Sequence, residues 1–151
     1  MPSFDFEEQR IVEEIQRLNA KRVVLQMPQG LKPHAISIAK IVEDAGAVAI
    51  ISSDPCYGAC DIALFDAELV AADLVVHFGH AKMVMPHHKL PARYIETRAK
   101  IPIELALQQA LPLLLPYKAV GLTTSIQHIN ALADARQFLA GHGKIVLIGD
   151  A

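Results

Sequence analysis

The residues of this chain whose types and spacing most clearly suggest chemistry are its two cysteines, Cys56 and Cys60, which share the segment 54–61. A separation of four residues is neither the C-x-x-C pair of a thiol oxidoreductase nor half of a common zinc site. Pro55 and Gly58 place Cys56 in a turn. Cys60 is expected close to the N-terminus of a following helix, where the helix dipole favours a thiolate. We therefore predict that Cys60 is the better metal ligand and that Cys56 is a small buried hydrophobic residue.

Two histidines are the other candidate ligands. His77 or His80 can complete a zinc site with the cysteines, although their spacing matches no common zinc pattern. An iron–sulfur cluster normally takes four cysteine ligands, or three when one iron stays open for substrate. The two thiols of this chain are therefore too few to hold such a cluster alone.

Short apolar segments alternate with amphipathic ones along the chain. Strands are expected at 22–27, 47–52, 74–78, 92–96, 119–123 and 144–148, and helices at 5–18, 33–45, 60–71, 102–114 and 125–140. Asp5 and Glu8 fit a capping box, and Ser125 is the expected N-cap of the last helix. Continuous apolar strands between helices predict an α/β fold, doubly wound, with a mostly parallel sheet flanked by helices and with residues 1–151 as a single domain.

Small and polar residues collect where these strands end. Ligands bind at the carboxyl ends of strands in open α/β sheets, so we expect one shared edge to carry Gln26, Gln29, Gly30, Ser52, Ser53, Asp54, His77, Gly79, His80, Thr123, Thr124, Ser125, Gln127, Gly149 and Asp150. The turns 29–30 and 124–125 are expected to open helices whose free N–H groups suit a carboxylate or phosphate. The simpler alternative is that these loops are polar because loops generally are.

Bulk composition sets limits on the class of protein. The chain has 151 residues, of which 52% are hydrophobic and 20% charged, so one domain with a buried core is feasible. A formal net charge of -2 gives no electrostatic case for binding nucleic acid. No apolar stretch approaches the ~20 residues that cross a bilayer, and the acidic N-terminus does not resemble a signal peptide. We expect a soluble protein of a reducing cytoplasm, with no membrane partner, cut at a domain junction near Gly149.

Four stretches resemble the diphthamide synthase one/two family, which includes the radical enzyme of diphthamide synthesis in archaea. They occur in the family's order at 25–31 (Leu-Gln-Met-Pro-Gln-Gly-Leu), 54–61 (Asp-Pro-Cys-Tyr-Gly-Ala-Cys-Asp), 76–80 (Val-His-Phe-Gly-His) and 123–128 (Thr-Thr-Ser-Ile-Gln-His). The most specific part is Tyr-Gly-Ala-Cys-Asp, whose cysteine is Cys60. Together the four stretches span most of the chain.

The resemblance implies three similar α/β domains, each giving one cysteine to a central 4Fe-4S cluster, with Cys60 as the ligand from the first domain. It further implies that S-adenosylmethionine binds the open iron and is cleaved to a 3-amino-3-carboxypropyl radical. That group is then added to a histidine of translation elongation factor two, the first step of diphthamide biosynthesis, by an enzyme that is a homodimer. On this basis the candidates for substrate or cofactor binding are Gln29, Gly30, Asp54, Tyr57, His80, Thr124, Ser125 and Gln127.

The chain departs from the family because it ends after what would be the first domain and lacks the later cluster cysteines, so we expect the fragment alone to be inactive. Two alternatives stay open: a domain of another three-domain iron–sulfur enzyme, of the quinolinate synthase type, or a stand-alone α/β binding domain with incidental thiols. Asp54 can instead cap its turn and His80 can instead pack its loop. The loop 82–88 looks longer or more basic than the family's, and no role is assigned to His87 or His88.

Overall fold

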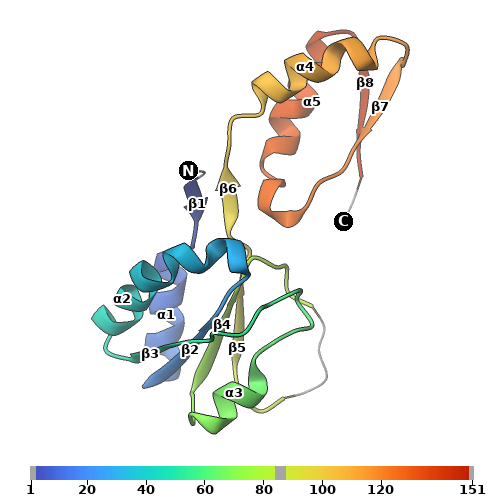
Figure 1. Ribbon diagram of the computed structural model, residues 1–151. Helices are drawn as coiled ribbons and strands as arrows, with labels where there is room; N and C mark the ends of the chain where they lie inside the picture. Colours follow the sequence, from blue (N-terminus) through green and yellow to red (C-terminus); the bar gives the residue numbers. More distant parts are fainter. Residues whose placement is uncertain (1–2, 84–87, 150–151) are drawn as a thin grey trace. The chain divides into compact units, whose positions relative to one another are not determined.

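The computed structural model describes residues 3–83 and 88–149, which divide into two compact units. The first unit comprises residues 5–97, and the second comprises residues 98–149 with residues 3 and 4. Strands alternate with helices, and the strands of the larger sheet are parallel (Figure 1), so the predicted α/β class is confirmed. His87 and Asp150 lie outside the described residues.

The first unit is built on one four-stranded sheet. Its elements in chain order are α1 (Glu8–Leu18), β2 (Arg22–Gln26), the 3-10 helix η1 (Gln29–His34), α2 (Ala35–Asp44), β3 (Val48–Ile51), α3 (Leu64–Leu69), β4 (Leu74–Phe78) and β5 (Ala92–Ile95). The strand order is β3-β2-β4-β5, and every pair is parallel. Every residue of β4 is buried, which explains why its sequence is continuously apolar apart from one histidine.

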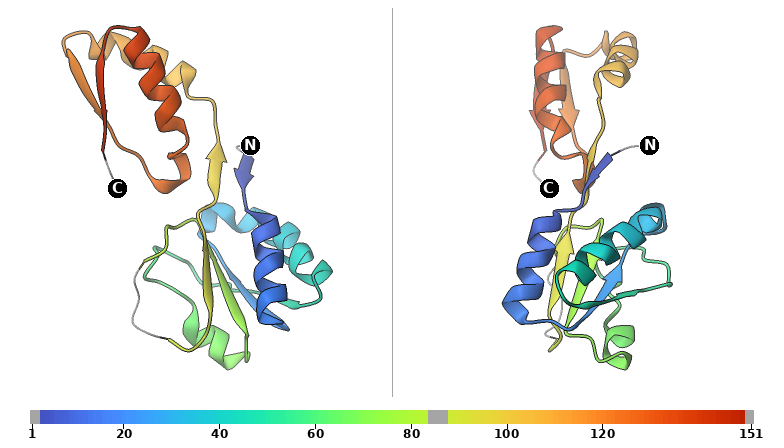
Figure 2. Two further views of the ribbon diagram at one scale, coloured as in Figure 1. Left: turned by 180° about the vertical axis from the view of Figure 1, so that it is seen from behind. Right: turned by 90° about the vertical axis from the view of Figure 1, so that its left-hand side faces the viewer.

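Helices cover both faces of this sheet. On one face, Val24 of β2 and Val75 of β4 pack against Ala67 of α3. Side chains alternate between the faces along a strand, so the neighbours of Val24 point to the opposite face. There α1 and α2, which contact each other, contribute buried residues such as Ile11 and Ile38 (Figures 1 and 2). Burial of an aliphatic side chain of this size stabilises the folded state by about 1.5–3 kcal/mol, so these residues fix which face of the sheet the two helices cover.

The first unit ends at Thr97, which is fully buried and has a φ of 55°. Positive φ is unusual for a β-branched residue and costs about 1–3 kcal/mol. The Thr97 hydroxyl donates to the carbonyl of Ile95 at 3.2 Å and accepts the N–H of Gly79 at 3.2 Å. These two bonds hold the last residue of the unit beside the end of β4.

The second unit contains two small sheets. Its elements are β6 (Arg98–Lys100), α4 (Glu104–Leu114), β7 (Ala119–Leu122), the 3-10 helix η2 (Ile126–His128), α5 (Ala131–Gly141) and β8 (Ile145–Ile148), with β6 paired to β1 (Ser3–Asp5). Strands β7 and β8 pair in parallel. The Lys144 ammonium donates to the carbonyls of Leu114 and Tyr117, which ties the end of α4 to the start of β8.

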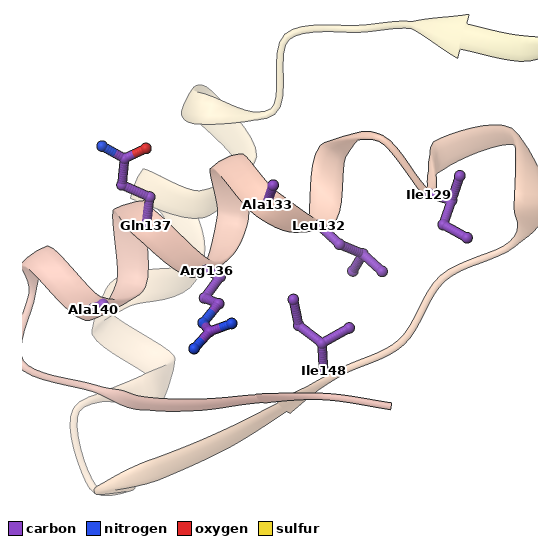
Figure 3. Close-up of a pocket in the computed structure, with 7 residues that line it drawn as sticks. All are labelled: Ile129, Leu132, Ala133, Arg136, Gln137, Ala140 and Ile148. Atoms are coloured by element: carbon purple, nitrogen blue, oxygen red, sulfur yellow. The ribbon is translucent and has the colours of Figure 1, made fainter. Parts of the chain in front are cut away.

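An apolar groove of about 560 Å³ lies in the second unit. In Figure 3, Leu132 of α5 and Ile148 of β8 point toward each other across it, while Gln137 points away. The lining residues are Ile129, Leu132, Ala133, Arg136, Gln137, Ala140 and Ile148. Among the described residues, none of the site candidates drawn from the sequence lines this groove.

Several predicted helix starts are wrong, each for a local reason. The helix expected at 60–71 is the shorter α3, because the chain first makes a turn in which the N–H of Asp61 donates to the carbonyl of Gly58. The segment 29–34 forms a 3-10 helix, so α2 begins at Ala35 rather than near Pro33. The segment 126–128 likewise forms a 3-10 helix, and α5 begins at Ala131.

The predicted caps are also wrong. Glu7, in a left-handed conformation, occupies the N-cap position of α1 without a side-chain cap, and the carboxylate of Asp5 accepts the N–H of Glu7 instead. Ser125 precedes η2 and makes no side-chain capping bond. Strands β1 and β6 lie outside every strand predicted from the sequence.

The predicted common edge is confirmed only in part. Strands β2, β3 and β4 belong to one sheet, so the loops that follow them share its carboxyl edge. Strands β7 and β8 form a separate sheet, so the prediction that their loops share the same sheet edge is wrong. Within the described part of the chain, no helix has the length and apolar character needed to span a bilayer.

Candidate functional site

A row of three polar side chains crosses the carboxyl edge of the first unit's sheet. Gln26, His77 and Tyr94 come from β2, β4 and β5, and the strand register pairs Gln26 with His77 and His77 with Tyr94. Their exposures are 3%, 0% and 7% respectively, so all three are buried. Because they follow Val24 and Val75 at even spacing, Gln26 and His77 point to the face that α3 covers. The row therefore lies beneath the loop that carries the cysteines.

The side-chain amide of Gln26 joins this loop to the sheet. Its Nε2 donates to the carbonyl of Asp61 at 2.7 Å, and its Oε1 accepts the N–H of Ala63 at 2.9 Å. A carbonyl can only accept and a backbone N–H can only donate, so these two partners fix the orientation of the amide. The same Oε1 lies 2.8 Å from Nδ1 of His77.

The tautomer of His77 follows from that contact. Gln26 Oε1 can only accept, so His77 Nδ1 carries the proton and His77 Nε2 presents a lone pair. Nε2 lies 2.9 Å from Nδ1 of His80 and 3.9 Å from Sγ of Cys56. Burial, helped by the neighbouring His80, lowers the pKa of His77 to about 4, and burial also lowers the pKa of His80. Both imidazoles are thus neutral at neutral pH.

The two cysteines lie in different surroundings. Cys56 is buried beside His77, and burial raises the pKa of its thiol, so the prediction of a small buried residue is confirmed. Cys60 is exposed and lies within a turn, and three residues separate it from Leu64, the first residue of α3. The prediction that Cys60 lies at a helix N-terminus is therefore wrong, and its availability comes from exposure instead.

The loop that holds both cysteines is fixed at its middle. The carboxylate of Asp61 accepts the N–H of Tyr57 at 3.1 Å, and the hydroxyl of Tyr94 donates to the carbonyl of Ala59 at 2.9 Å. The side chain that bonds the turn is thus that of Asp61, whereas Asp54 had been considered for this role. Tyr57, a candidate for substrate or cofactor binding, is 85% exposed, so its ring is not packed within this unit.

The start of the loop is held by a lysine. The Lys32 ammonium donates to the carbonyls of Ser53 and Asp54. Asp54 is exposed and lines a separate cavity of about 300 Å³ beside β3. The hydroxyl of Ser52, which lines the same cavity, is buried without a hydrogen-bond partner among the described residues.

The loops after β2 and β4 approach each other closely at Gly79. This residue has a φ of 83°, and a Cβ placed on it would lie 3.1 Å from Pro28 Cγ. Both the backbone angle and the contact therefore require glycine. The approach places His80, which follows Gly79, beside the cysteine loop.

The remaining predicted site residues are divided between the units. Gln29 and Gly30 are exposed at the start of η1 in the first unit. Thr124, Ser125 and Gln127 belong to the second unit. Within the first unit, the structure brings His80 together with Cys56 and His77.

Tyr94, Asp61 and Lys32 were not assigned these roles from the sequence. The position of Tyr94 could have been inferred from the sequence. It follows Ala92 by two residues in an expected strand, so both side chains lie on the same face of the sheet. The bonds of Asp61 and Lys32 depend on how the loop folds, and no spacing rule in the sequence indicates them.

The chain matches known proteins over most of its length. Residues 27–151 match the family model described as "Putative diphthamide synthesis protein". A 2-(3-amino-3-carboxypropyl)histidine synthase from Pyrococcus horikoshii is 34% identical over 143 residues, covering 92% of this chain and 41% of that protein. Subunit 1 of the same synthase from Bos taurus is 33% identical over 150 residues, covering 96% of this chain and 34% of that protein.

Solved structures agree with these matches. The crystal structure of Dph2 from Pyrococcus horikoshii matches with a TM-score of 0.85 and 31% identity, covering 97% of this chain and 43% of that one. The crystal structure of the same protein with a 4Fe-4S cluster matches equally well. The chain therefore spans between about a third and two fifths of the length of these relatives.

Proposed function

This chain belongs to the family of diphthamide synthesis proteins, and on that premise we propose that it forms part of a 2-(3-amino-3-carboxypropyl)histidine synthase. The observation that carries the proposal is the exposed thiol of Cys60, presented on a loop that hydrogen bonds fix to the carboxyl edge of a parallel sheet. A solved relative with a TM-score of 0.85 carries a 4Fe-4S cluster. The Cys60 thiol is the group in this chain best placed to bind such a cluster.

The residues of this chain fit one corner of a 4Fe-4S cluster. Cys60 is exposed, whereas the Cys56 thiol is buried 3.9 Å from His77 Nε2. A cluster of this type takes three or four thiolates, so the other ligands must come from parts of the enzyme beyond this chain. When bound, the cluster supplies the electron that cleaves S-adenosylmethionine. The bonds of Asp61 and Tyr94 to the loop backbone hold Cys60 in position for ligation.

We further propose S-adenosylmethionine as the cosubstrate, translation elongation factor two as the protein substrate, and a homodimer as the working enzyme. The cosubstrate carries one carboxylate, and the turns at Gln29 and Ser125 are the candidates to bind it. The variants Gln29→Pro and Ser125→Pro, which each remove one backbone N–H, test this point by the affinity for S-adenosylmethionine, and unchanged affinity in both would count against these turns. The family match favours this function over a quinolinate synthase-type enzyme and over an unrelated binding domain.

The experiment is anaerobic reconstitution of the full-length gene product with iron and sulfide, followed by transfer of the 3-amino-3-carboxypropyl group to elongation factor two. We expect Cys60→Ala to lose cluster iron, visible absorbance and transfer. Cys56→Ala is the matched control, and it should keep the cluster absorbance. A cluster that survives Cys60→Ala, or a full-length protein that binds no cluster, would contradict the proposal.

A further inference from the structure

A second group of possible metal ligands lies beside the cysteine loop and does not include Cys60. It consists of Cys56, His77 and His80, and we call it the histidine–cysteine group. Each residue offers one ligand atom, and these atoms lie within 4.8 Å of one another. Cys56 and His77 are buried and His80 is half-buried. Two neutral imidazoles and a thiol are thus held together where solvent has little access.

The orientation of His77 is the one that metal-binding histidines adopt. A ligating imidazole usually donates its other ring N–H to a carbonyl or carboxylate, which fixes the tautomer and the ring. Here His77 Nδ1 donates to Gln26 Oε1 at 2.8 Å, and backbone partners at Asp61 and Ala63 hold that amide in place. The lone pair of His77 Nε2 is thereby presented to the other two members of the group.

Two of the three distances between ligand atoms are near those of a tetrahedral zinc site. Bonds of about 2.05 Å to nitrogen and 2.3 Å to sulfur place two nitrogens about 3.3 Å apart and a nitrogen and a sulfur about 3.6 Å apart. In this structure His77 Nε2 lies 2.9 Å from His80 Nδ1 and 3.9 Å from Cys56 Sγ. Shifts of a few tenths of an ångström would bring both pairs to these separations. The third pair, Cys56 and His80, lies within 4.8 Å and must close further when the ion binds. The hydrogen bond between the two imidazoles would then be replaced by two metal–nitrogen bonds.

We propose that Cys56, His77 and His80 bind a divalent transition-metal ion of the zinc class, at a site separate from Cys60. Imidazole and thiolate ligands suit Zn²⁺ among the common divalent ions. Binding releases one proton, from the Cys56 thiol, while His80 ligates as a neutral imidazole whose remaining proton moves to its other ring nitrogen. Three protein ligands leave one coordination position open for water or a substrate atom, as in catalytic rather than structural zinc sites.

The test is titration of the metal-free 151-residue chain with Co²⁺, which replaces Zn²⁺ and reports a thiolate ligand by its charge-transfer absorbance. We expect one Co²⁺ per chain with thiolate absorbance, displaced by one equivalent of Zn²⁺. Cys56→Ser should abolish the absorbance, and Cys60→Ser, the matched control, should keep it. Circular dichroism checks that each variant is folded. Should Cys56→Ser fail to fold, the half-buried His80→Gln replaces it, and at least a tenfold weaker Co²⁺ affinity is expected.

Absence of thiolate absorbance in the unmodified chain would overturn the site. Absorbance that Cys60→Ser removes and Cys56→Ser retains would overturn it as well. The titration involves neither iron, sulfide nor S-adenosylmethionine. Its outcome is therefore independent of whether the full-length enzyme assembles a 4Fe-4S cluster.

Discussion

Lowering the pH from 7 to 4 should destabilise the metal-free chain by about 3 kcal/mol through His77 alone. The folded protein holds the pKa of His77 at about 4 through burial and through the neighbouring His80, against an ordinary value of 6.5. Between pH 4 and 6.5, His77 binds a proton in the unfolded chain but not in the folded chain. The free energy of unfolding therefore rises with pH across this window. Each tenfold difference in proton affinity corresponds to about 1.4 kcal/mol. The free energy of unfolding is therefore undiminished by His77 above pH 6.5, and it falls as the pH is lowered toward 4.

The assay is urea unfolding followed by circular dichroism, with a chelator present, at several pH values between 7 and 4. His77→Gln should be less stable at pH 7 but should lose about 3 kcal/mol less than the unmodified chain on acidification. Glu14 and Asp73, whose pKa values are lowered by hydrogen bonds, also lose stabilising charge as the pH falls, but they do so in both proteins and cancel in the difference. The exposed His88→Gln is the control and should follow the unmodified chain. Parallel pH profiles for His77→Gln and the unmodified chain would refute the reasoning.

Substitutions at three further positions of the first unit test its hydrogen bonds and packing by urea or thermal unfolding. Gln26→Met should cost about 2–4 kcal/mol because three polar groups lose their partner, and a cost under about 1 kcal/mol would contradict the described bonding. Gly79→Ala should cost about 2 kcal/mol because of its positive φ and its approach to Pro28, and an unchanged melting temperature would disprove that loop conformation. Asp73→Ala should cost about 1–2 kcal/mol, because the Asp73 carboxylate accepts two backbone N–H groups at the start of β2, at 2.7 and 2.9 Å. Asp73→Asn keeps an acceptor oxygen and should cost less.

The strands of the first unit could be predicted because burial on both faces leaves a continuous apolar run. Strand β4 has the predicted bounds, Leu74–Phe78, and β2 is one residue shorter than predicted. Helix starts could not be predicted as well, because short polar contacts decide them. For example, the periodicity of apolar residues predicts a helix from Cys60. The hydrogen bond from the N–H of Asp61 to the carbonyl of Gly58 forms a turn there instead.

The candidate site could be predicted as a location but not as a set of contacts. Gln26 and His77 stand out as polar residues in apolar strands, and the parallel sheet brings them to one edge. Which cysteine faces His77 depends on the path of the loop from 52 to 63, which is fixed by bonds from residues distant in sequence. Sequence spacing therefore favours Cys60 as the general metal ligand, whereas the structure places Cys56 beside the histidines.

The position of Thr97 has a mechanical consequence. The chain leaves the first unit through a residue whose hydroxyl accepts the N–H of Gly79, and Gly79 is the direct neighbour of His80. A change in the backbone conformation at Thr97 would therefore alter a hydrogen bond of the residue that precedes His80, a ligand of the histidine–cysteine group. The hydrogen bond between Thr97 and Gly79 thus joins the last residue of the first unit to the backbone beside His80.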